Sequence, residues 1–245
     1  MTVSEAVWNR YVRAFGRINR QANAAMRQWI DANGTEDLHA MTEQAYGIAT
    51  AYGEAAAALS AEMYDAVAAM EGVALPAAEM AETATWSDVS DAIYGISSYS
   101  SNTELLSGSV ERLVKRAGAD TTIKNAIRDR AEWAWVPSGD SCAFCATLAA
   151  NGWLPASESM LEGGHAEHIH AHCDCEFAIR HDRDTKYASY DPEKYERLYY
   201  SAPLDGDAPT ADNRINALRR EFYAENRDRI NAQKRAAYAR RKGNE

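Results

Sequence analysis

Apolar residues recur at helical spacing through the first 134 residues. Between residues 4 and 30 they follow one another at steps of three and four, while five arginines lie largely on the other face. The same spacing predicts a second helix from Glu36 to Met70, ended by Gly72 and Pro76. Four shorter helices are predicted over residues 77–84, 92–96, 103–115 and 120–133. Residues 1–134 are therefore expected to form a multi-helix region.

The pattern changes after residue 134. A tryptophan-rich stretch leads into a cysteine turn, residues 146–151 read as a short helix, and Glu176 to Ile179 reads as a short strand. Residues 181–211 are charged and tyrosine-rich, which predicts a linker, and residues 212–245 read as one long basic helix. The fold class is thus expected to be mainly α, with a small treble-clef-like α+β lobe over residues 135–180.

That lobe carries a pattern typical of a zinc site. Cys142 and Cys145 form a C-x2-C turn, and Cys173 and Cys175 would point to the same face of an extended segment. His170 precedes Cys173 by three residues and can reach the same ion if the chain turns. The candidate ligands of a single structural Zn2+ are Cys142, Cys145, His170, Cys173 and Cys175, with His168 and His172 beside them. Because a structural zinc takes four ligands, which four bind stays open.

Two other chemistries fit the same residues. Two disulfides are one alternative, but the N-terminus has no basic and apolar leader, so we expect synthesis in a reducing cytoplasm. A catalytic zinc is the other, with Glu167 or Asp174 as the acid or base. The chain shows no glycine-rich phosphate loop and no Ser-His-Asp order. We therefore expect a structural zinc and no enzymatic activity.

Charge is unevenly distributed along the chain, although the net charge is −10. Residues 1–27 hold five arginines against one acid, residues 28–111 hold fourteen acids and no lysine or arginine, and residues 211–245 hold ten basic residues against five acids. Basic ends around an acidic middle indicate self-association or charged partners, or simply a solvated acidic surface. The most apolar region, residues 45–69, is interrupted by Glu54, Glu62 and Asp65, which argues against a membrane span.

A family resemblance rests on residues 130–180. The string from Val136 through Cys142-Ala-Phe-Cys145 to Gly152-Trp153, followed by His170-x-x-Cys173-Asp-Cys175, resembles the minor capsid (head morphogenesis) proteins of tailed bacteriophages, the Mu F-like group. The resemblance implies a structural role in head assembly near the portal, with portal and capsid proteins as partners and the virion as location. Packaged DNA is a further partner that the basic ends suggest.

Two other functions fit the same residues. One is a zinc-lobed nuclease of the His-Asn-His type, for which His168, His170, His172 and Glu167 are the candidates. The other is a DNA-binding regulator that uses the cysteine turn and the basic C-terminal helix, although the acidic body argues against tight DNA binding.

Overall fold

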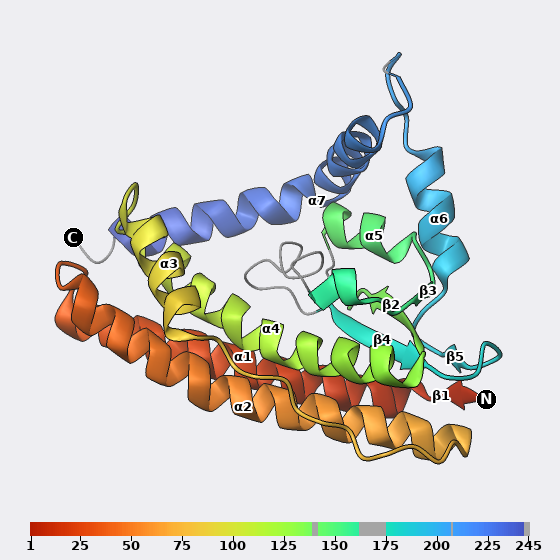
Figure 1. Ribbon diagram of the computed structural model, residues 1–245. Coiled ribbons are helices and arrows are strands. Elements are labelled where there is room, and N and C mark those ends of the chain that lie inside the picture. Colours follow the sequence, from red (N-terminus) through yellow and green to blue (C-terminus); the bar gives the residue numbers. More distant parts are fainter. Residues whose placement is uncertain (139–141, 162–174, 207, 243–245) are drawn as a thin grey trace. The chain divides into compact units, whose positions relative to one another are not determined.

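The computed structural model describes residues 1–138, 142–161, 175–206 and 208–242 (Figure 1). The described residues form seven helices and a small amount of sheet, so the mainly helical prediction is confirmed. The chain divides into two compact units that are discontinuous in sequence: Met1–Gly139 with Trp153–Tyr190, and Asp140–Gly152 with Asp191–Glu245.

Helices α1 (Glu5–Asn33), α2 (Leu38–Glu71) and α4 (Thr103–Asp129) make the core of the first unit. The two predicted N-terminal helices are confirmed. Ser4 and Asp37 cap them by accepting N-terminal N–H groups, and Gly34 and Gly72 end them at positive φ. Fully buried side chains fill the space between the helices: Trp8, Phe15, Met26, Met41, Tyr64, Leu106 and Ile123.

Helix α4 is continuous where two helices were predicted. Gly118 does not break it; a Cβ atom there would lie 2.4 Å from Phe15 Cε2 and 2.8 Å from Ser60 Oγ. The glycine therefore lets α4 approach α1 and α2 closely. The hydroxyls of Thr121 and Thr122 bond back to carbonyls one turn earlier, at 2.8 and 3.2 Å, instead of capping a new helix. The prediction that this helix runs to Trp133 is also wrong, because α4 ends at Asp129 and Arg130 takes a left-handed conformation.

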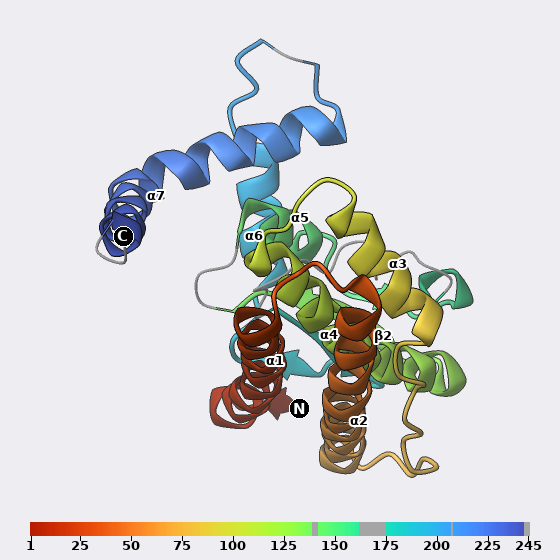
Figure 2. The same cartoon turned by 90° about the vertical axis from the view of Figure 1, so that its left-hand side faces the viewer.

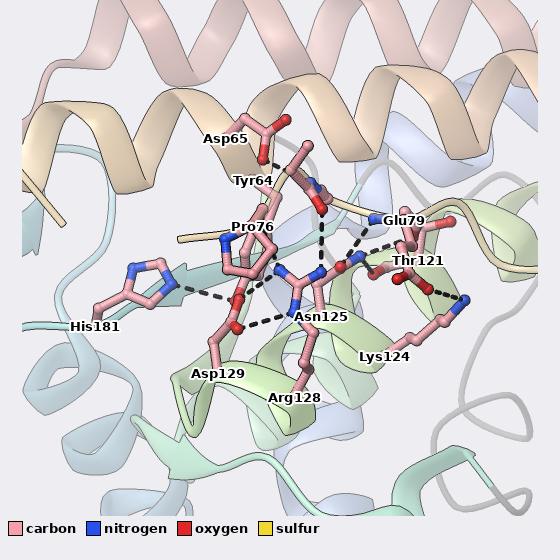
Figure 3. Close-up of polar contacts among 12 residues, drawn as sticks. Tyr64, Asp65, Pro76, Glu79, Thr121, Lys124, Asn125, Arg128, Asp129 and His181 are labelled. Carbon is pink, nitrogen blue, oxygen red and sulfur yellow. Dashed lines mark hydrogen bonds and ion pairs between the residues drawn. The ribbon is translucent and has the colours of Figure 1, made fainter. Parts of the chain in front are cut away.

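The helix predicted over residues 77–84 is not formed either. This stretch is extended, and side chains bind its N–H groups: Asp65 accepts from Ala78, Asn125 from Glu79 and Thr121 from Ala81, at 2.8–3.0 Å (Figure 3). The Arg128 guanidinium adds bonds to the carbonyls of residues 76 and 77, both 3.0 Å long. Side chains of α2 and α4 thus already form hydrogen bonds with backbone groups of this stretch, so these groups do not need a helix to be paired. Helix α3 (Trp86–Ser97) follows, with a capping box between Thr85 and Asp88.

The sheet of the first unit has the order β3-β2-β4 (Leu154–Pro155, Glu132–Val136 and Glu176–Arg180), with both pairings antiparallel. The strand predicted over residues 176–179 is confirmed as β4. Strand β2 is buried at four of its five positions, and the rings of Trp133 and Trp135 lie against the ring of Phe177. A second, two-stranded sheet pairs β1 (Thr2–Val3) with β5 (Lys186–Tyr187) in parallel.

The second unit contains α5 (Ala143–Ala149), α6 (Pro192–Ser201) and α7 (Ala211–Lys242). The long basic helix predicted from residue 212 is confirmed as α7. Helix α6 lies inside the stretch expected to be a linker; Asp191 caps it by accepting from the N–H groups of Glu193 and Lys194, and Pro192 opens its first turn. Among the described residues of this unit, one apolar cluster joins the three helices; its buried members are Ala143, Ala202, Ala217 and Leu218, with Leu198, Tyr199, Leu204 and Phe222 packed against them.

Candidate functional site

The C-x2-C turn lies at the start of α5. Cys142 is the last extended residue before the helix, with φ −79° and ψ 165°, and its carbonyl accepts from Ala146 N at 3.0 Å. Cys145 is in the first helical turn and is fully buried, whereas Cys142 is exposed. This change from extended to helical backbone brings the two sulfur atoms to 3.7 Å from each other.

That separation suits two thiolates that share one metal ion. A disulfide bond is about 2.05 Å long, so the 3.7 Å between these sulfurs excludes a bond between them. Two sulfurs bound to one tetrahedral zinc at about 2.3 Å each would be roughly 3.8 Å apart. The distance is therefore compatible with two ligands of one tetrahedral site, and equally with two thiols in contact.

Cys175 immediately precedes β4 and is buried. Its carbonyl accepts a hydrogen bond from Lys115 Nζ, and the same ammonium group lies 3.0 Å from Glu176 Oε1. Both side chains of this ion pair are about 95% buried, with exposed fractions of 5% and 6%. The pairing of Val136 with Glu176 and of Trp135 with Phe177 holds the strand on the other side. The backbone at Cys175 is thus fixed by both α4 and β2.

The remaining candidates lie outside the described residues. These are His170 and Cys173, and with them His168, His172, Glu167 and Asp174. In the part of the chain that the structure describes, no three His, Cys, Asp or Glu side chains are grouped as metal ligands would be. The five-residue ligand set and the zinc itself therefore stay predictions.

A second polar cluster was not anticipated from the sequence. The ring of His181, which follows β4, lies between two side chains of α2: its Nδ1 is 2.6 Å from Glu71 Oε2 and its Nε2 is 3.2 Å from the Tyr64 hydroxyl. Tyr64 donates to Asp129 Oδ2 at 2.9 Å, and Arg128 forms an ion pair with Asp129 at 2.7 Å (Figure 3). No motif links these five residues, because they come from three distant segments.

Charge and burial shift the pKa values within this cluster. Burial acts to raise the pKa of Glu71, but hydrogen bonds from the side chain and N–H of His181 outweigh it and lower that pKa below its usual value. The hydrogen bonds from Arg128 lower the pKa of Asp129 despite partial burial. Burial and the Asp129 carboxylate raise the pKa of Tyr64. The tyrosine thus remains a neutral donor. The cluster links the end of β4 to α2 and α4, and its Arg128 also binds the extended residues 76 and 77.

The fold and the paired-cysteine turn define a mainly helical protein with a small sheet and one candidate metal-binding segment. The family model described as VG15 protein matches residues 2–202, and the chain belongs to this phage-associated family. No curated protein and no solved structure shows significant similarity. Within the described residues, none of the helices is both long and apolar enough to span a membrane.

Proposed function

We propose that this protein is a minor structural component of a tailed-phage head that acts in head assembly near the portal. The proposal combines the match to a phage-associated family over residues 2–202 with the resemblance of residues 130–180 to Mu F-like minor capsid proteins. The single structural observation that supports it most is the 3.7 Å separation of Cys142 and Cys145, because paired cysteines carry that resemblance. The role is structural and not catalytic.

We propose further that one zinc ion is bound by four of the five candidate ligands. Its part would be to stabilise residues 135–179, a segment too short to build a sufficient apolar core of its own. A metal–thiolate site can replace the stability that such a small core lacks. The buried hydrogen bond from Lys115 to the carbonyl of Cys175 would hold the backbone at this residue in place.

Helix α7 is the element that we propose for contact with packaged DNA. Among its side chains in the described part, Arg219, Arg220, Arg227 and Arg235 are exposed. Arg214 instead lies over the rings of Tyr199 and Tyr200, at 5.6 and 4.9 Å from their centroids, and so helps to fix the start of the helix. Exposed arginines on one helix attract phosphate groups, and this attraction weakens as salt rises.

The head-assembly role is tested by deleting the gene in its phage or prophage and supplying it from a plasmid. We expect the deletion to lower the yield of DNA-filled heads seen by electron microscopy, with recovery by the wild-type gene but not by Cys145→Ser. Ser141→Ala, next to the turn, is the matched control and should restore heads. Normal heads without the gene would contradict the proposal. Mg2+-dependent cleavage of plasmid DNA by the purified protein, lost in His170→Ala, would instead favour the nuclease.

A further inference from the structure

Helix α1 exposes a row of arginines that the core does not use. Arg10, Arg13 and Arg17 are exposed and, in the described part of the chain, none of them forms an ion pair. At 1.5 Å of rise per residue the row is about 10.5 Å long. With Ala6 and Asn9 these arginines line a shallow hollow of about 480 Å³. We call these three residues the arginine row.

The same unit carries a groove lined by aromatic rings and carboxylates, whose charge is opposite to that of the arginine row. It has a volume of about 500 Å³ and lies between α2 and the extended connection before α3. Tyr46 and Trp86 line it with partly exposed rings whose centroids are 5.6 Å apart at 70°. Glu54 and Glu82 line it with exposed carboxylates that, among the described residues, form no ion pair. We call this the aromatic–acidic groove.

The chemistry of this groove fits guanidinium groups. Arginine stacks on aromatic faces and binds carboxylates through a planar fork of donors, so rings next to carboxylates suit it better than any other side chain. Tyr46 and Glu54 are eight residues apart on α2, so this wall of the groove is about 12 Å long. That length matches the arginine row.

We propose that the arginine row of one copy of this protein docks into the aromatic–acidic groove of a second copy. Figure 2 shows α1 on one side of α2 and the connection that forms the groove on the other. Row and groove belong to the same compact unit, so one copy cannot close the contact on itself. The contact joins two different surfaces, so it is made either twice in a two-fold dimer or head-to-tail in a ring or filament.

Charge favours a second copy over nucleic acid as the occupant. Phosphate groups would be attracted to the arginine row, but Glu54 and Glu82 would repel them from the groove. A second copy satisfies both surfaces at once. This inference goes beyond the proposed function and does not depend on it, since self-association can be measured on the purified protein alone.

The test is sedimentation of the full-length protein at low salt over a range of concentrations. A row variant carries Arg10→Glu, Arg13→Glu and Arg17→Glu, and a groove variant carries Glu54→Arg and Glu82→Arg. We expect wild type to associate and each variant alone to associate at least about tenfold more weakly, because like charges would then face each other. An equimolar mixture of the two variants should recover association, since each mutated surface meets a complementary one. Glu62→Arg, exposed on α2 outside the groove, should behave as wild type.

Three results would overturn the proposal. They are a wild type that remains monomeric at low salt, variants that associate as well as wild type, and a mixture that does not recover. Circular dichroism of each variant shows whether it is folded. If wild type stays monomeric and the row variant alone loses binding to a DNA duplex of about 20 base pairs, the arginine row is a nucleic-acid surface.

Discussion

The Nδ1 atom of His181 lies 2.6 Å from Oε2 of Glu71, across 110 residues of sequence. Both side chains are almost completely buried, with exposed fractions of 7% and 1%. Glu71 also accepts from the N–H groups of His181 and Asp182, at 3.0 and 3.4 Å. One carboxylate at the end of α2 therefore fixes the chain where it leaves β4.

Glu71→Gln is expected to destabilise the protein. The substitution keeps the shape but removes the charge that these hydrogen bonds stabilise, and a lost charge-assisted bond costs about 1.5–3 kcal/mol. Urea denaturation of the full-length protein measures the change in the free energy of unfolding. Glu62→Gln, exposed on the same helix, is the matched control and should change it by less than about 0.5 kcal/mol. Equal effects of the two substitutions would contradict the role given to Glu71.

The same carboxylate predicts a dependence of stability on pH. Because its pKa is lower in the folded protein than its ordinary value of 4.5, Glu71 stabilises the fold fully above about that pH. The contribution is lost as the pH falls from there through the lower, folded pKa. Thermal melting between about pH 6 and pH 3 should therefore show a smaller loss of Tm for Glu71→Gln than for wild type. Parallel profiles would show that Glu71 does not titrate in this way.

Gly118→Ala tests the close packing of α4. Its Cβ would lie 2.4 Å from Phe15 Cε2, so the ring or the helix must shift, at a cost of about 1–3 kcal/mol. Gly95→Ala on α3 is the matched control, because a Cβ there meets nothing within 4 Å. It should leave stability unchanged or raise it by up to about 1 kcal/mol. If both substitutions stabilise the protein, α4 does not pack as described.

Lys115→Met tests the buried ion pair behind Cys175. Removing the ammonium leaves the Glu176 carboxylate buried without this partner, which typically costs about 3–5 kcal/mol. Adding Glu176→Gln should recover part of the loss, since the buried charge is then gone. Chemical denaturation of the three proteins measures both steps. If the double variant is less stable than Lys115→Met, the two substitutions destabilise the protein independently, and this account of the pair is contradicted.

Removal of zinc is expected to affect stability and thiol reactivity. Protein purified without chelator should contain close to one zinc by elemental analysis, and Cys145→Ser should lower that content. A strong chelator should lower Tm and expose the cysteines to a thiol reagent, because thiolates held by a metal react slowly. Protein that holds no zinc, and whose cysteines react equally with and without chelator, would rule out the site.

The sequence predicted the elements that depend on local pattern. The apolar spacing of α1 and α2 was sufficient, as were the basic periodicity of α7 and the apolar run at β4. Prediction from the sequence failed where contacts with residues far away in the chain determine the local structure. Gly118 reads as a helix break until Phe15 is known to lie against it, and the alanine-rich residues 77–84 read as a helix until Asn125 and Thr121 bind their backbone.

The candidate site, too, could be predicted from the sequence only in part. The C-x2-C spacing predicted paired sulfurs, and the turn at α5 places them together. Lys115 could not be found from the sequence, because a lysine on a helix is usually exposed and its partners are 60 and 61 residues away. His181 was missed for a related reason, since it stands outside the cysteine and histidine cluster.

The most direct test of the central claim is peptide mass spectrometry of density-purified particles from a host that carries this gene. A minor head protein should be present at a few copies per particle and should remain after washing at high salt. Peptides found in the cell lysate but absent from the particles would contradict a role in the virion and favour the nuclease or the DNA-binding regulator.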